Sequence, residues 1–220
     1  GAIVIGAGLF TYLGNTQITL IEPSRGQWGT RVTITGTNLF AGGTTVSDVT
    51  LGGVSVESIV SATSTSIVVR ANVSTSTGLG SIVLVSDSGA RSVKENSWLY
   101  ETASAITGVS PGSGQRGTSV TISGTNLLGN NPVFGASITS VLLGGTAPAR
   151  IVSQTASQIV VTAQNGTAGL GGVLLEASNG AKTSLTGSWT YLVDSEITNI
   201  APISGQVGTR VQINGTNLPS

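Results

Sequence analysis

The amino-acid sequence predicts an all-β fold built from tandem β-sandwich modules. Three observations lead to this prediction. The 220 residues repeat with a period of about 90, each repeat alternates polar with β-branched apolar residues as strands do, and no stretch has a helical period. Length alone allows one large all-β domain or two ordinary ones, so the repeat decides the domain organisation.

The repeat is clearest around three prolines, Pro23, Pro111 and Pro202, which are 88 and 91 residues apart. Each proline follows an Ile-Thr pair and precedes a Gly-Gln-x-Gly-Thr segment, and a Tyr lies six residues before each Ile-Thr. We therefore predict the end of one module in residues 1–17, complete modules in 18–105 and 106–196, and the start of another in 197–220. Because both ends interrupt a module, we expect the array to continue on either side.

The elements of a module follow from its pattern. A first strand leads to the proline, and an alternating strand with one apolar face follows the glycine turn at Arg31–Thr35 and Ser119–Ser123. The pairs Gly52-Gly53 and Gly144-Gly145 suit a tight hairpin turn. Two more apolar runs and an aromatic last strand bring the total to about seven strands per module, which is typical of an immunoglobulin-type sandwich.

The core of each module is predicted from its apolar positions. One Trp and one Tyr near the end of each complete module supply the largest buried area, and the alternating strand adds two aliphatic residues. The predicted core comprises Val32, Ile34, Trp98 and Tyr100 in one module and Val120, Ile122, Trp189 and Tyr191 in the next. The predicted turn glycines, which permit positive φ, are Gly26, Gly29, Gly114, Gly117, Gly205 and Gly208.

The repeated pattern resembles that of a known family. Ile-Thr-x-x-x-Pro, Gly-Gln-x-Gly-Thr and Val-x-Ile-x-Gly-Thr-Asn-Leu each occur three times, and together they resemble the IPT/TIG family, the immunoglobulin-like fold shared by plexins and some transcription factors. The resemblance covers essentially the whole chain and implies a fold and an interaction role, with no catalytic residue. The chain departs from the receptor forms in lacking Cys and from the transcription factors in lacking basic loops. These departures favour the arrays of surface proteins, and with them an elongated array of stacked modules.

The composition is unusually poor in charge. Only 8% of the residues are charged, against about 25% in a typical globular chain. Nine basic residues balance nine acidic ones and no run of Lys or Arg occurs, so a nucleic-acid or anionic-membrane partner would lack its electrostatic attraction. The polar, uncharged surface favours an extracellular or cell-surface location and leaves little repulsion between copies. The apolar stretch Ala2–Ile5 is too short to span a bilayer, so we expect no membrane insertion in this segment.

Two short motifs resemble catalytic or cofactor-binding signatures. Residues Gly112–Gly117 match GxGxxG, but a β-alternating run follows them where dinucleotide binding needs a helix. Residues Gly108–Gly112 match GxSxG around Ser110, but the chain has no His for a catalytic relay. The absence of His and Cys also excludes a zinc site. The sequence therefore predicts a protein that is not an enzyme and that binds no cofactor or metal.

The acidic residues between modules leave one alternative open. Asp194 and Glu196 are either ligands of a calcium ion that stiffens the linker or solvated linker charges. The corresponding linkers at residues 14–17 and 102–105 carry no acid at all. The lack of repetition favours the solvated charges.

Three sequons make glycosylation a candidate modification. Asn72-Val-Ser and Asn165-Gly-Thr follow an Ile-Val-Val run in corresponding loops, one residue out of register. Asn214-Gly-Thr is a weaker match, because it falls in a Gly-Thr-Asn turn. Glycans at the first two asparagines would hydrate an otherwise uncharged surface.

The repeat and the lack of a chemical site favour a structural function, namely a fibre or stalk built from stacked modules. Its expected partners are copies of itself, neighbouring modules and glycans, with no nucleic acid. The alternative is an adhesin or receptor ectodomain that binds a protein or glycan through its loops, with Phe40 or Phe134 exposed there. A third interpretation is an accessory domain of a carbohydrate-active enzyme.

Overall fold

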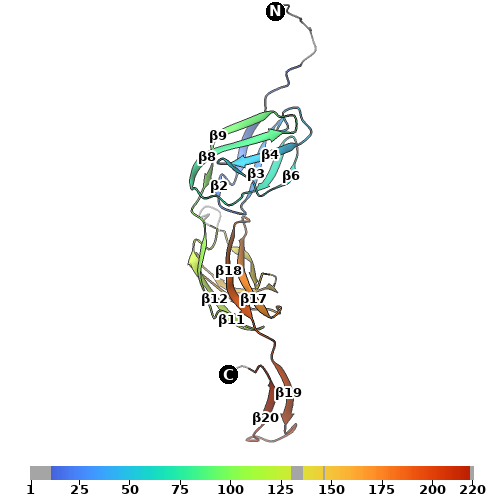
Figure 1. Ribbon diagram of the computed structural model, residues 1–220, viewed down its shortest axis with the longest axis vertical. Coiled ribbons are helices and arrows are strands. Elements are labelled where there is room, and N and C mark those ends of the chain that lie inside the picture. Colours follow the sequence, from blue (N-terminus) through green and yellow to red (C-terminus); the bar gives the residue numbers. More distant parts are fainter. Residues whose placement is uncertain (1–10, 130–135, 146, 219–220) are drawn as a thin grey trace, which may run out of the picture. The chain divides into compact units, whose positions relative to one another are not determined.

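The computed structural model describes residues 11–129, 136–145 and 147–218, and within these ranges it contains strands and turns and no helix. Figure 1 shows the strands arranged as sheets that recur along the chain. We call β1–β9 the first sandwich, β10–β18 the second sandwich and β19–β20 the terminal hairpin. The sequence prediction of tandem all-β, immunoglobulin-like sandwiches is confirmed.

The first sandwich consists of two sheets, with strand orders β1-β3-β7-β6 and β2-β9-β8-β4-β5. Neighbouring strands are antiparallel except for the short β2, which pairs with the end of β9 in parallel. The strands are β1 (Gln17–Glu22), β2 (Arg25–Gly26), β3 (Arg31–Thr37), β4 (Val46–Leu51), β5 (Val54–Ser55), β6 (Ser58–Ala62), β7 (Ser66–Arg70), β8 (Gly78–Ser86) and β9 (Arg91–Tyr100).

The second sandwich repeats this topology, with strand orders β10-β12-β16-β15 and β11-β18-β17-β13-β14. Its strands are β10 (Ala105–Ser110), β11 (Ser113–Gly114), β12 (Ser119–Thr125), β13 (Ile138–Leu143), β14 (Ala147–Pro148), β15 (Arg150–Gln154), β16 (Gln158–Thr162), β17 (Gly169–Ala177) and β18 (Lys182–Tyr191). The GxGxxG match at Gly112–Gly117 contains β11 and is followed, after Thr118, by the strand β12, where dinucleotide binding needs a helix.

The core of each sandwich is made by the inward faces of both sheets. In β3 the burial alternates along the strand, and the side chains of Val32 and Ile34 are 0% exposed. Trp98 is also 0% exposed, and its ring meets that of Tyr100 edge to face, with centroids 5.5 Å apart. Val120, Ile122, Trp189 and Tyr191 occupy the equivalent positions of the second core, where the two rings are 5.4 Å apart. A buried Trp of this kind contributes about 3–5 kcal/mol relative to Ala.

The Gly-Gly pairs form the hairpin turns between β4 and β5 and between β13 and β14. Gly52 and Gly53 have φ of 55° and 84°, and Gly144 and Gly145 have φ of 66° and 85°. Two successive positive φ angles match the twist of the flanking strands, and only glycine adopts them without strain.

The terminal hairpin consists of β19 (Glu196–Ala201) and β20 (Gln212–Thr216), and it repeats the pairing of β1 with β3. Ile200 faces Ile213 across this hairpin as Ile21 faces Ile34, and both pairings have a bulge at the corresponding place. The side chain of Ile213 is 52% exposed, whereas that of Ile34 is 0% exposed. The hairpin therefore has the strand pairing of a sandwich without the opposing sheet that would cover its apolar residues.

Contacts divide the chain into two compact units. One is built mainly from residues 11–104 and includes the segment Ala177–Lys182, and the other contains Ala105–Leu128, Ser137–Glu176 and the chain from Thr183 onward. No helix in the described ranges has the length and apolar character needed to cross a membrane.

Candidate functional site

A glutamine side chain binds the chain segment that leaves each sandwich. In the first sandwich, Gln27 is only 2% exposed, and its Nε2 donates to Oγ of Ser104 over 2.8 Å. Its Oε1 accepts a hydrogen bond from the backbone N–H of the same serine. One side chain thus holds both the backbone and the side chain of Ser104, four residues after β9 ends. We call this pair of hydrogen bonds the glutamine clamp.

The second sandwich has the same clamp. Nε2 of Gln115 donates to Oγ of Ser195 over 2.6 Å, and Oε1 of Gln115 accepts from the backbone N–H of Ser195 over 2.8 Å. Ser195 lies four residues after β18 ends, as Ser104 does after β9. The clamp is therefore a repeated feature of the modules.

The segment that enters a module is held by an asparagine of that module. Asn217, in the Gly-Thr-Asn-Leu segment of the terminal hairpin, donates from Nδ2 to the carbonyl oxygen of Asp194 over 3.4 Å, and its own carbonyl accepts from Oγ of Ser195. Asn38 in the first sandwich likewise binds the carbonyl oxygen of Gly14. Ser195 is thus held by Gln115 from one side and by Asn217 from the other.

The Gly-Gln-x-Gly-Thr turn positions the clamp glutamine. Oγ1 of Thr30 accepts from the backbone N–H of Gln27 over 3.0 Å, and Oγ1 of Thr118 does the same for Gln115 over 3.1 Å. A Cβ added to Gly26 would lie only 2.5 Å from Oγ1 of Thr30, so the threonine side chain occupies the space that this Cβ would need. The turn therefore needs its first glycine to make room for the threonine.

Among the six predicted turn glycines, a positive φ occurs at Gly29, Gly117 and Gly208, with values of 83°, 89° and 92°. Gly26, Gly114 and Gly205 do not have a positive φ. At each of them an added Cβ would lie 2.5–2.6 Å from the hydroxyl oxygen of Thr30, Thr118 or Thr209. Steric room, rather than backbone conformation, requires glycine there.

The sequon asparagines lie in different environments. Asn72 is half-buried after β7, and its Oδ1 accepts from the backbone N–H of Val73 over 2.8 Å. Asn165 is exposed after β16, at the position that Val73 occupies in the first sandwich. Asn214 is exposed within β20, and its Oδ1 accepts from Nε2 of Gln212 over 3.2 Å. The shift of one residue between the first two sequons therefore turns Asn165 outward.

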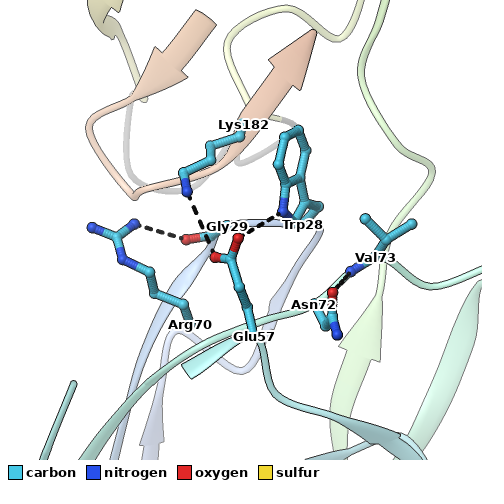
Figure 2. A network of polar contacts seen from close by, with 7 residues as sticks. All are labelled: Trp28, Gly29, Glu57, Arg70, Asn72, Val73 and Lys182. Carbon is cyan, nitrogen blue, oxygen red and sulfur yellow. Dashed lines mark hydrogen bonds and ion pairs between the residues drawn. The ribbon is translucent and has the colours of Figure 1, made fainter. Parts of the chain in front are cut away.

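A polar network surrounds Glu57 at one edge of the first unit (Figure 2). Its carboxylate accepts from Nε1 of Trp28 over 3.3 Å and lies 3.6 Å from Nζ of Lys182, which is 5.6 Å from the centroid of the Trp28 ring. Nη1 of Arg70 donates to the carbonyl oxygen of Gly29 over 3.4 Å. The network gathers three of the chain's few charged side chains around one exposed tryptophan edge.

Two carboxylates have shifted pKa values. Hydrogen bonding, first of all from the Thr44 hydroxyl over 2.6 Å, lowers the pKa of Asp87 to about 2. Burial raises the pKa of Glu101, and Arg25, whose Nη1 is 3.5 Å from Glu101 Oε1, partly offsets this effect. Each of the two carboxylates contacts a residue of its own sandwich, Thr44 for Asp87 and Arg25 for Glu101.

Ser110, Asp194 and Glu196 resemble a catalytic serine and two calcium ligands in the sequence. Ser110 is the last residue of β10, Asp194 lies in the linker after β18, and Glu196 is the first residue of β19. Within the described ranges no group of three or more His, Cys, Asp or Glu side chains is placed to hold a metal ion. Phe40, considered as an exposed loop contact, is instead half-buried and packs against the core of the first sandwich. Phe134 lies outside the described residues.

One pocket of the first sandwich lies beside its sequon loop. It has a volume of about 290 Å³ and is lined by the Gly52-Gly53 turn, the loop Ser74–Gly80 and Tyr100. On the loop side, the residues that line this pocket include four with hydroxyl groups, namely Ser74, Thr75, Ser76 and Thr77.

The clamp glutamines and asparagines were missed by the sequence analysis, although a signal for them was present. Gln27, Gln115 and Gln206 occupy the same place in all three copies of the turn, as do Asn38, Asn126 and Asn217 in theirs. An amide that recurs at one place in a short motif indicates a hydrogen-bonding role. Its partner was not evident, because Ser104 lies 77 residues beyond Gln27.

Comparison with known proteins gives the family. The IPT/TIG domain model matches residues 16–98 and 104–191. No curated protein matches the chain. The solved structures that resemble it include the plexin A4 extracellular region, with 21% identity, a TM-score of 0.48 and coverage of 89% of this chain and 17% of that one. Another is the surface glycan-binding protein PbSGBP-B of Prevotella bryantii, with 13% identity, a TM-score of 0.34 and coverage of 82% and 43%.

The chain spans less than half the length of these structures, and their TM-scores are below 0.5. The family assignment therefore comes from the sequence match, which covers both sandwiches and agrees with their repeated topology. This chain belongs to the IPT/TIG domain family, with two successive domains.

Proposed function

We propose that the chain is a structural, non-catalytic segment of an extracellular or cell-surface fibre or stalk made of stacked IPT/TIG modules. The observation that carries this proposal is the glutamine clamp, which occurs in both sandwiches at the point where the chain leaves for the next module. A clamp of this kind restricts the linker's backbone and reduces bending at the junction. A receptor that needs flexible modules would have no use for it.

The terminal hairpin supports the same proposal. The apolar residues Val211, Ile213 and Leu218 are 53%, 52% and 39% exposed, whereas their counterparts Val32, Ile34 and Leu39 are at most 1% exposed. We propose that residues 197–220 are the first hairpin of a further module and that residues 1–17 are the last part of a preceding one. The complete modules are then 18–105 and 106–196.

The surface chemistry fits an extracellular setting. The chain has few charges and no net charge, so little charge repulsion protects it from association. We propose that glycans at Asn72 and Asn165 hydrate this surface, and that Asn214 is the poorest acceptor because it lies within a strand.

The clamp can be tested through flexibility. The double variant Gln27→Ala, Gln115→Ala is expected to broaden the distribution of molecular dimensions measured by small-angle X-ray scattering, with the sandwiches still folded by circular dichroism. Gln158→Ala is the matched control, because Gln158 is exposed on β16 and its side chain makes no hydrogen bond within the described ranges. An unchanged distribution in the double variant would refute the role of the clamp.

The fibre itself is tested on native material. Electron microscopy is expected to show filaments or stalks, and glycopeptide mapping to find glycans at Asn72 and Asn165. Only compact globular particles in a native preparation would overturn the structural function.

The loop pocket supports a second candidate, an adhesin or receptor module that binds a glycan. The pocket is small and rich in hydroxyl groups and backbone, which suits a hydroxylated ligand. A glycan array with the wild-type chain and a Ser76→Trp variant, which fills the pocket, tests this function. Ser61→Trp on the exposed side of β6 is the control. Binding by the wild type and the control, but not by Ser76→Trp, would favour this candidate.

A further inference from the structure

We propose that Asn165-Gly166 is a site of spontaneous deamidation, at which the fold leaves an asparagine free to cyclise. The sequence has three Asn-Gly pairs, at Asn165, Asn179 and Asn214. Glycine after asparagine offers the least steric resistance to attack by its backbone nitrogen. The three pairs differ in exposure and in hydrogen bonding, and this difference identifies the reactive pair.

At Asn165 neither reacting group is hydrogen-bonded to any residue that the structure describes. The side chain is exposed in the loop between β16 and β17. Within the described ranges, neither the Asn165 amide nor the Gly166 backbone N–H makes a hydrogen bond. Cyclisation at Asn165 therefore breaks no hydrogen bond to a described residue.

At Asn179 both groups are held. Its Oδ1 accepts from the Ala181 backbone N–H over 3.0 Å, and its Nδ2 donates to the Gly129 carbonyl oxygen over 3.4 Å. The N–H of Gly180 donates to the carbonyl oxygen of Ala177 over 2.8 Å. Cyclisation here requires the turn to open first. Asn214 is intermediate, because it lies in the β19–β20 ladder and its Oδ1 is bound by Gln212.

The packing of Gly166 against a core residue explains why a glycine follows Asn165. An added Cβ on Gly166 would lie 2.5 Å from Cζ of Tyr191, a core residue that is 3% exposed. The contact with Tyr191 therefore requires glycine here, and this glycine makes Asn165 reactive. In the first sandwich the residue after Asn72 is Val73, whose branched side chain hinders the same attack.

The reaction is a substitution at Cγ followed by hydrolysis. The Gly166 nitrogen loses its proton and attacks Cγ of Asn165, the N–Cγ bond forms, the Cγ–Nδ2 bond breaks, and Nδ2 leaves as ammonia. Water then opens the succinimide at either carbonyl, giving aspartate or isoaspartate. Each event adds one negative charge to a chain whose formal net charge is zero. A glycan on Nδ2 of Asn165 is an alternative fate of the same atom and protects it.

The test uses the full chain produced without glycosylation and incubated at mildly alkaline pH. Peptide mapping by mass spectrometry, with an isoaspartate assay, follows the three asparagines over time. Because Asn179 must lose several hydrogen bonds before it reacts, we expect deamidation at Asn165 to be at least about tenfold faster. A rate at Asn165 equal to or below that at Asn179 would overturn the proposal.

Two controls separate the fold from the local sequence. In denaturant the rates at the three Asn-Gly pairs should converge, and a ranking that persists there would refute the structural explanation. Asn165→Gln should remove most of the isoaspartate formed by the folded chain, whereas Asn72→Gln should leave it unchanged. Isoaspartate that survives Asn165→Gln would place the reactive site elsewhere and contradict the assignment.

Discussion

The tyrosines of the two cores have hydroxyl groups that are buried without a hydrogen-bond partner in the described part of the chain. This holds for Tyr100 and Tyr191, and for the indole N–H groups of the tryptophans they pack against. Burial raises the pKa of Tyr100 to about 12 and also raises that of Tyr191. Because the folded-state pKa of Tyr100 exceeds the ordinary value of 10.0, its contribution to stability is complete below pH 10 and is lost as the pH rises through about 12.

At the scale of single residues, we predict that Tyr100→Phe leaves the free energy of unfolding at neutral pH unchanged or raises it by about 1 kcal/mol. The substitution removes a buried hydroxyl that lacks a partner while keeping the ring. The variant should also lose less stability than the wild type at alkaline pH. Urea unfolding at neutral and alkaline pH measures both effects, with Tyr12→Phe as the control because Tyr12 is 90% exposed. A clear loss of stability at neutral pH would contradict the prediction.

At the scale of elements, the Gly-Gln-x-Gly-Thr turn shows what the sequence does and does not reveal. Its position between two strands and the positive φ of its second glycine, such as Gly29, could be predicted, because periodicity and glycine content are local signals. The contact between Thr30 and Gly26 could not be predicted, because it depends on how the turn closes. The clamp of Gln27 on Ser104 could not be predicted either, because it requires the whole sandwich to fold between them.

We predict that Thr30→Val destabilises the first sandwich by about 1–3 kcal/mol, because the buried N–H of Gln27 loses its acceptor while the side-chain volume hardly changes. Thr118→Val should have a similar effect on the second sandwich. Thermal or urea unfolding measures the change. Thr77→Val is the control, because Thr77 is exposed and makes no hydrogen bond within the described ranges. Equal stability of Thr30→Val and Thr77→Val would show that the turn does not depend on this bond.

Thr44, in the loop before β4, donates hydrogen bonds to the carboxylate of Asp87, so the stability of the chain should depend on the protonation of Asp87. Its pKa of about 2 is below the ordinary aspartate value of 3.8, so its stabilising contribution is present above pH 3.8 and is lost as the pH falls through about 2. Asp87→Asn should therefore destabilise the chain at neutral pH, and the difference from wild type should disappear in strong acid. A double-mutant cycle with Thr44→Val should show coupling at neutral pH and none in acid.

At the scale of the whole molecule, the repeat made the fold predictable, since the first two strands of the module are seen three times and the other strands twice. Which apolar side chains are exposed was harder to predict from the sequence. The residues of β19 and β20 have the same pattern as those of β1 and β3, and only the structure shows that Ile213 is 52% exposed where Ile34 of β3 is 0% exposed. Burial depends on the presence of an opposing sheet, which a local pattern does not report.

We predict that the 220-residue segment, when produced without the remainder of the proposed further module, self-associates through the terminal hairpin, and that deletion of residues 197–220 reduces this association. The hairpin exposes several large apolar side chains, and the low charge provides little repulsion. Sedimentation velocity over a concentration series and binding of a hydrophobic dye measure the effect. The double variant Val211→Ser, Ile213→Ser should act like the deletion. A segment that stays monomeric and binds no dye would contradict this prediction.

The clamp also bears on how the linkers can change over evolutionary time. Oε1 of Gln27 and of Gln115 accepts from a backbone N–H, a group that every residue except proline offers. The residues next to Ser104 are Ala103 and Ala105, whereas those next to Ser195 are Asp194 and Glu196, yet both serines are held in the same way. A junction held through the main chain and one serine hydroxyl tolerates mutational drift at the flanking residues, so an array can diversify its linkers without loosening the way it is joined.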